Sequence, residues 1–134
     1  MVEINNRTKS HINLSLVKKV AEKFLRAYKK IGYEVSVVFV GDSVIRRLNK
    51  TYRLQDRITD VLAFRGEGKF LGEIIIDYAQ IKRQAPKFSS NTQKELIFIL
   101  VHGLLHLMGL EDKTAKGKKE MERAGQEFIK KLKY

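Results

Sequence analysis

The chain has 134 residues, of which 27 are Lys or Arg and 15 are Asp or Glu, so its formal net charge is +12. Its length predicts a single domain, residues 1–134, with an apolar core large enough to fold without cross-links. The lack of cysteine excludes disulfides and cysteine-bound zinc, and the positive charge favours a polyanionic partner, either nucleic acid or an anionic membrane surface.

The sequence offers no hydrophobic stretch long enough to cross a bilayer. The longest apolar run, residues 96–110, is interrupted by His102, Gly103 and His106 and is shorter than the ~20 residues of a membrane span. The first ten residues are polar and lack the apolar core of a signal peptide. We therefore expect a soluble, cytoplasmic protein without a membrane partner.

The hydrophobic pattern predicts strands and helices interspersed along the chain with short connections. Strands are predicted at residues 2–6, 33–40, 60–64 and 70–77. Helices are predicted at residues 15–31, 43–53, 78–85, from 92 to the segment around 107, and 117–132. This order of elements indicates an α+β or a mixed α/β domain.

Particular residues are predicted to mark the helix ends. Gly32 lies just past the end expected for the first helix, and Asp42 is suited to be the N-cap of the second. The third helix should stop before Pro86, the only proline. Asn91 or Thr92 should cap the long fourth helix, since Thr92 and Glu95 have the spacing of a capping box.

The segment 101–112, VHGLLHLMGLED, places two of the three histidines four residues apart in a predicted helix. His102 and His106 would share one face of that helix and could ligate one metal ion, as the pair in H-E-x-x-H does. Gly109 would end the helix in a left-handed conformation and turn the chain back, so that Asp112 could approach the pair. Two imidazoles and one carboxylate leave a coordination position open, which is typical of a catalytic zinc site.

Other interpretations of the same segment stay open. The two histidines could be core residues hydrogen-bonded to neighbours, and Glu111 competes with Asp112 as third ligand, although the spacing favours Asp112. A glycine at 103, inside a helix, costs ~1 kcal/mol relative to alanine, so either His102 needs space beside it or the helix packs closely against a strand. The H-E-x-x-H peptidases have their glutamate base at this position, so Gly103 disfavours a peptidase.

The histidine segment resembles the signature of the YbeY family, bacterial rRNA maturation factors and metal-dependent endoribonucleases. Other segments resemble the family in the same order along residues 35–112. They are LNKTYRLQDRITDVLAF (48–64), LGEIII (71–76), QA (84–85) and KEL (94–96). The resemblance implies a compact α+β fold, in which a small mixed sheet is packed by about five helices, one of them a zincin-like metal-binding helix.

The resemblance also implies a zinc site of three histidines, of which His102 and His106 match the first two. The family's third histidine falls at position 112, where this chain has aspartate. A carboxylate binds zinc at a similar distance, so we expect one divalent ion, Zn²⁺, held by His102, His106 and Asp112. Because an oxygen ligand is harder than an imidazole, the site should tolerate manganese or magnesium better.

Arg53 matches the family's arginine near the site, and with His102 it forms the predicted catalytic pair. A guanidinium can hold a phosphate through two hydrogen bonds and stabilise charge that grows on it. The residues alone favour a solvated arginine among its basic neighbours, and the resemblance reverses this preference. Thr59 and Asp60 begin a strand and are expected either to brace the site or to cap backbone groups rather than to bind the metal. Tyr52 and Phe70 could stack on bases of single-stranded RNA, although aromatics at such positions are more often core.

Three hypotheses for the function follow. The first is a metal-dependent, single-strand-specific endoribonuclease that acts in rRNA processing and ribosome maturation, with rRNA of the small subunit as its partner. The second is a non-catalytic ribosome-assembly factor that binds RNA and keeps a structural metal, which the aspartate at 112 motivates. The third is a zinc metallopeptidase, which Gly103 disfavours.

Overall fold

Segments rich in β-branched and aromatic residues form one four-stranded sheet in the computed structural model, which describes residues 1–88 and 90–133. The strands are β1 (Val2–Asn6), β2 (Glu34–Val40), β3 (Val61–Arg65) and β4 (Phe70–Asp77). Their order in the sheet is β1-β2-β4-β3, with β1, β2 and β4 parallel and β3 antiparallel to β4. The predicted strands are confirmed to within one residue, and β3 is an edge strand.

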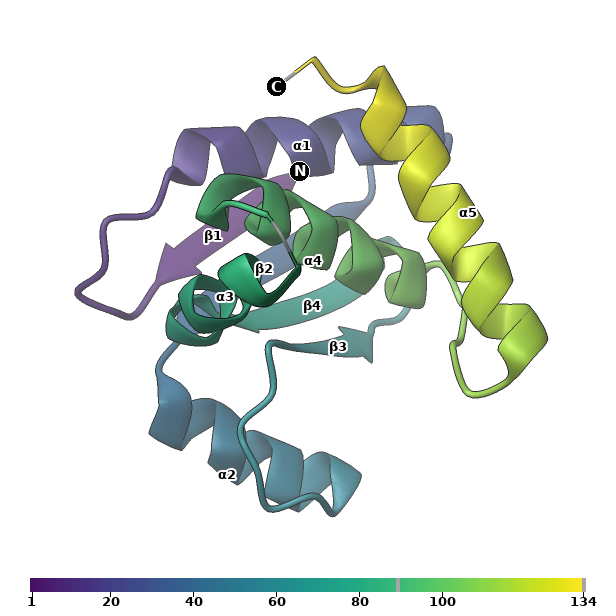
Figure 1. Ribbon diagram of the computed structural model, residues 1–134. Coiled ribbons are helices and arrows are strands. Elements are labelled where there is room, and N and C mark those ends of the chain that lie inside the picture. The colour runs from purple at the N-terminus through teal and green to yellow at the C-terminus, as the bar shows by residue number, and fades with distance from the viewer. Residues whose placement is uncertain (89, 134) are drawn as a thin grey trace.

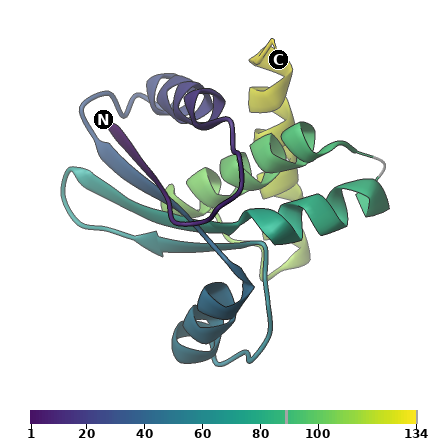
Figure 2. The ribbon, with the colours of Figure 1, turned by 90° about the vertical axis from the view of Figure 1, so that its left-hand side faces the viewer.

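Helices cover both faces of this sheet (Figures 1 and 2). They are α1 (Leu14–Ala27), α2 (Asp42–Arg53), α3 (Tyr78–Gln84), α4 (Thr92–Leu107) and α5 (Ala115–Lys131), with a 3₁₀ turn at Ala85–Phe88. Helices α1 and α4 lie on one face, α2 lies on the other, and α5 packs against α4 (Figure 1). The described residues thus confirm the α+β class, with a small mixed sheet and five helices.

The strands bury alternate side chains on opposite faces, as a period of two residues requires. The larger core joins α1 and α4 to one face of the sheet. Its members from β2 and β4 are Val35, Val37, Phe39, Ile74 and Ile76. The smaller core joins α2 to the other face through Val38, Val40, Ile45, Leu62 and Ile75. Both faces of the central strands are therefore covered, which explains their nearly continuous apolar sequences.

Helix α4 is apolar around most of its circumference and is buried between the sheet, α1 and α5. One stripe of α4 stays accessible and consists of residues spaced four apart: Lys94, Phe98, His102 and His106. Apart from its first turn, the described part of α4 reaches solvent only along this stripe, which carries both histidines.

The prediction that Gly32 terminates the first helix is wrong. Helix α1 ends at Ala27, and Lys29 takes the left-handed conformation beyond it, with φ 57°. The Lys30 N–H donates to the Leu25 carbonyl at 2.7 Å, which closes the helix without a glycine. Gly32 also has a positive φ, but it lies in the following loop.

Asp42 is the first residue of α2 and not its N-cap, which is Gly41. The Asp42 carboxylate instead accepts two hydrogen bonds from the Arg83 guanidinium, at 2.8 and 3.1 Å. Helix α3 ends before Pro86 as predicted, although the chain continues through that proline as a 3₁₀ turn.

The cap of α4 is Asn91, whose side chain accepts from the Lys94 N–H at 2.9 Å. The capping box expected for Thr92 and Glu95 does not form, because Glu95 is buried and accepts from Gln84 instead.

Every helix among the described residues is too short or too polar to cross a lipid bilayer.

Candidate metal centre and its cleft

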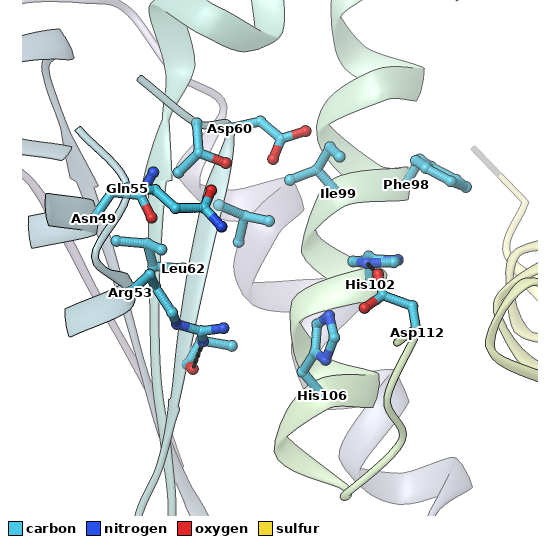
Figure 3. Close-up of a pocket in the computed structure, with 13 residues that line it drawn as sticks. Asn49, Arg53, Gln55, Asp60, Leu62, Phe98, Ile99, His102, His106 and Asp112 are labelled. Atoms are coloured by element: carbon cyan, nitrogen blue, oxygen red, sulfur yellow. Dashed lines mark hydrogen bonds and ion pairs between the residues drawn. The ribbon is translucent and has the colours of Figure 1, made fainter. Parts of the chain in front are cut away.

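A cleft of about 370 Å³ opens along the outer edge of β3, between the end of α2 and the accessible stripe of α4. Figure 3 shows Arg53 on one side of this cleft and His102, His106 and Asp112 on the other. The edge position of β3 leaves the cleft open, because no further strand covers that side within the described residues. The residues that the sequence singled out from distant segments are therefore brought to one place.

The histidine pair behaves as its spacing predicts. The rings of His102 and His106 lie with their centroids 4.8 Å apart and nearly perpendicular, at 82°. After α4 ends at Leu107, Gly109 adopts a φ of 95°. The Leu110 N–H then donates to the Leu105 carbonyl at 3.1 Å, which closes the helix end in a Schellman motif. The predicted left-handed turn at Gly109 is confirmed.

This reversal brings Asp112 back to the histidines. An oxygen of its carboxylate lies 3.4 Å from His102 Nε2, and the potential ligand atoms of His102, His106 and Asp112 all lie within 4.8 Å of one another. Glu111 points elsewhere, with its carboxylate 3.5 Å from Lys113 Nζ. Of the two acidic candidates, the structure places Asp112 beside the histidines.

The His106 ring is oriented by the backbone that follows the helix. Its Nδ1 lies 3.1 Å from the Leu110 carbonyl oxygen. Because a carbonyl oxygen can only accept, Nδ1 carries the hydrogen and Nε2 presents its lone pair. Burial lowers the pKa of His106, and the neighbouring His102 lowers it further. The ring is therefore neutral at neutral pH, which is the form that binds a metal.

Gly103 allows α4 to approach the sheet closely. A Cβ at this position would lie 3.0 Å from Ile74 Cγ2 on β4. The reason for the glycine is thus close packing against a strand, one of the two explanations that the sequence allowed. With Gly103 buried against the sheet, the position that carries the general base in H-E-x-x-H peptidases offers no carboxylate.

Arg53 is the last residue of α2, and its guanidinium lies in the cleft opposite the histidines (Figure 3). Its Nη2 donates to the Ala63 carbonyl on β3 at 3.1 Å, and its guanidinium carbon lies 6.0 Å from the centre of the Phe64 ring. The charge of Arg53 is one of the causes that lower the pKa of His106. The bond to Ala63 uses one of five N–H donors, so the group can still bind an anion.

A hydrogen-bond network that the sequence did not reveal supports the end of the cleft at Asp60. The side-chain amide of Gln84 donates to Asp60 at 2.9 Å and to the buried Glu95 at 2.8 Å. It thereby joins α3, α4 and the start of β3. Asp60 and Thr59 both line the cleft, and Asp60 is itself held by this network. The sequence did contain one indication of this network, because Glu95 is an acidic residue next to a long apolar run and would need a polar partner if buried.

Two further residues were not singled out from the sequence. Asn49 is buried at 3% exposure, and its side chain donates to the Arg57 carbonyl at 3.0 Å, which holds the loop after α2 against the helix. Phe98 lines the cleft one turn before His102, so the four-residue spacing could have revealed it. In contrast, Tyr52 and Phe70 are neither core nor cleft residues, with 63% and 41% exposure.

The chain is similar to proteins of one known family along nearly its whole length. The family model described as endoribonuclease YbeY matches residues 3–133. The chain belongs to the endoribonuclease YbeY family. It is 37% identical to the endoribonuclease YbeY of Endomicrobium trichonymphae, across 90% of this chain and 85% of that protein. It is 42% identical to that of Moorella thermoacetica, across 72% of this chain and 70% of that protein.

A solved structure agrees with this YbeY assignment at the level of the fold. The solution structure of a Thermotoga maritima protein superimposes with a TM-score of 0.67 and 30% sequence identity. The match covers 97% of this chain and 87% of that one. The resemblance seen in the sequence is therefore confirmed, and its extent is larger than residues 35–112, since the terminal helices are included.

Proposed function

We propose that this chain is a metal-dependent endoribonuclease that hydrolyses phosphodiester bonds of single-stranded RNA in rRNA processing and ribosome maturation. The observation that carries the proposal is the placement of Arg53 across one cleft from His102, His106 and Asp112 in a member of the YbeY family. The name of the relatives, endoribonuclease, supports it. A net charge of +12 also suits a polyanionic substrate.

Zn²⁺ is the metal that we propose for the site. Two imidazole nitrogens and a carboxylate oxygen form a donor set that zinc accepts in catalytic sites. The tautomer of His106 supports the same assignment, because its Nε2 lone pair is directed away from the Leu110 carbonyl. When bound, the ion would supply a Lewis acid and lower the pKa of a coordinated water.

The other residues of the cleft would bind and orient the RNA. Arg53, fixed through Ala63, would donate two hydrogen bonds to the phosphate and stabilise the charge that develops on it. His102 would bind the metal ion on the side of the cleft opposite Arg53. The reacting phosphate would then lie between these two residues, which are the proposed catalytic pair. Asp60, held by Gln84, would keep the entrance to the cleft in shape.

The test compares two histidine variants on a synthetic single-stranded RNA. His106→Ala removes a ligand, and we expect at least a 100-fold loss of cleavage together with loss of bound zinc by elemental analysis. His11→Ala is the matched control, because His11 is exposed and does not line the cleft. Its cleavage rate and zinc content should equal those of the wild type.

Equal cleavage by His106→Ala and wild type would disprove the metal mechanism. RNA binding without any cleavage by nuclease-free wild type would instead favour an assembly factor with a structural metal.

A further inference from the structure

The accessible stripe of α4 continues beyond the proposed metal ligands. Phe98 lies one turn before His102 and Lys94 one turn before Phe98. Each step of four residues advances about 6 Å along the helix axis. The ring of Phe98 is 45% exposed, and it lies nearly parallel to the ring of His102, at 28° and with centroids 6.3 Å apart. An exposed aromatic face therefore adjoins the candidate metal centre.

Beyond Phe98 the surface is hollowed by a groove of about 660 Å³ between the start of α4, the 3₁₀ turn and the end of α5. Its walls are mainly apolar and include Phe88, Ile97, Ile129 and Leu132. Lys94 and Lys130 also line it and supply positive charge, whereas the acidic Glu95 in its wall is buried and accepts a hydrogen bond from Gln84. Phe98 lines both this groove and the cleft of the metal centre, so the two hollows adjoin at its side chain.

We propose that this groove is a nucleobase subsite, in which the base next to the cleaved phosphodiester stacks on Phe98. Lys94 then binds the following phosphate. The inference rests on the proposed function, because the position of the base is defined by the phosphate held between Arg53 and the metal ligands. Figure 3 shows the corresponding order of side chains, with Arg53 at one end, His102 and Asp112 between, and Phe98 toward α5.

The shared wall at Phe98 and the charge of the groove together favour single-stranded RNA as the occupant. A strand held at its phosphate by Arg53 that leaves the cleft past His102 passes over Phe98. Aromatic faces combined with cations are the combination that binds single strands without reading their sequence, because every base has a face that stacks. An apolar peptide would gain nothing from lysines at both Lys94 and Lys130.

The experiment measures RNA affinity separately from cleavage. Fluorescence anisotropy with chelator-treated protein gives the Kd for a short labelled single-stranded RNA and for the same sugar-phosphate chain without bases, so no particular binding register is assumed. Removal of the bases should weaken binding to the wild type about 5- to 150-fold, the factor that ~1–3 kcal/mol of stacking corresponds to. Phe98→Ala should weaken binding to intact RNA by a similar factor and leave the affinity for the base-free chain unchanged.

Two variants control for structure and location. Phe98→Tyr keeps an aromatic face and should bind both RNAs as the wild type does. Phe70→Ala removes an aromatic side chain of similar exposure, 41%, that lines neither hollow, and its affinities should be unchanged. Lys94→Gln should weaken binding of both RNAs equally, since a phosphate contact does not depend on the base.

The subsite would be disproved if the wild type bound both RNAs equally, or if Phe98→Ala left the affinity for intact RNA unchanged. The subsite would also be disproved if sedimentation showed that the wild type is a dimer and Phe98→Ala a monomer. The groove would then be occupied by a second copy of the chain. Failure of the proposed function gives a different result, namely no cleavage by zinc-loaded wild type while the dependence on Phe98 and on the bases persists.

Discussion

Three side chains of the cleft are each held by a further contact that fixes their direction. The Leu110 carbonyl orients His106, the Ala63 carbonyl orients Arg53, and the amide of Gln84 orients Asp60. Backbone carbonyls fix two of these three groups, so their orientation depends on the path of the chain more than on particular neighbouring side chains. Substitution of the functional residues themselves should therefore remove chemistry while leaving the fold intact.

Substitutions of Arg53 test the role of a single side chain in catalysis without removing a metal ligand. Arg53→Gln should lower the turnover of RNA about 100-fold, the size of effect seen when one donor to a developing charge is removed. Arg53→Lys should recover only part of this loss, because an ammonium group cannot make two parallel hydrogen bonds to a phosphate. Zinc content should be normal in both, since Arg53 is not a ligand.

Arg47→Gln provides the control, because Arg47 is exposed on α2 and does not line the cleft. Full turnover by Arg53→Gln would exclude the guanidinium from the reaction.

Asp77 predicts a pH dependence of stability. It is fully buried, and its Oδ2 has no hydrogen-bond partner among the described residues. Burial raises the pKa of Asp77 from 3.8 to about 7, and the neighbouring Asp42 carboxylate raises it as well. The Arg83 guanidinium lowers the pKa of Asp42 to about 2, so Asp42 stays ionised above pH 4.

A raised pKa means that the protonated acid is favoured in the folded state. Its contribution to stability is complete below pH 3.8 and is lost as the pH rises to about 7. Asp77→Asn keeps a neutral side chain at every pH, so its free energy of unfolding relative to wild type should rise by ~2 kcal/mol from pH 5 to pH 7. Urea unfolding at both pH values measures this, with Asp56→Asn on the exposed surface as control. A constant difference would contradict the assignment.

The elements act on the site through their ends. Helix α2 ends where Arg53 can reach β3, and α4 ends where Gly109 turns the chain toward His102. The body of α4 is fixed by Gly103 against Ile74, so its accessible stripe has a defined direction. The helix ends therefore determine which side chains meet, and a change at an end should disturb the site more than the fold.

Gly109→Ala tests this relation, because Gly109 has a φ of 95° that other residues rarely adopt. We expect a loss of stability of ~1 kcal/mol and a weaker affinity for zinc, since Asp112 would no longer be directed at His102. Gly68→Ala is the matched control, because Gly68 also has a positive φ, 59°, with open space around it in the loop between β3 and β4. Equal zinc affinities in the two variants, measured by competition with a chromophoric chelator, would refute the role of the turn.

At the scale of the whole molecule, patterns local in the sequence were predictable and long-range contacts were not. The strands were predicted from runs of β-branched residues. The approach of Asp112 to the histidines was predicted from Gly109, which turns the chain back after α4. The end of α1 was missed, because Lys29 adopts a left-handed conformation that a lysine rarely takes. The bonds from Gln84 to Asp60 and Glu95 were missed because they join residues 24 and 11 positions apart in different elements.

In the proposed function, RNA cleavage requires one metal ion held by His102, His106 and Asp112. The most direct measurement is the initial rate of cleavage of single-stranded RNA by chelator-treated protein as Zn²⁺ is added back. We expect no cleavage without the ion and a rise that saturates at one equivalent of zinc per chain, whereas Asp112→Ala should need a large excess of zinc. Full cleavage by the metal-free protein, or saturation unaffected by Asp112→Ala, would contradict the metal requirement.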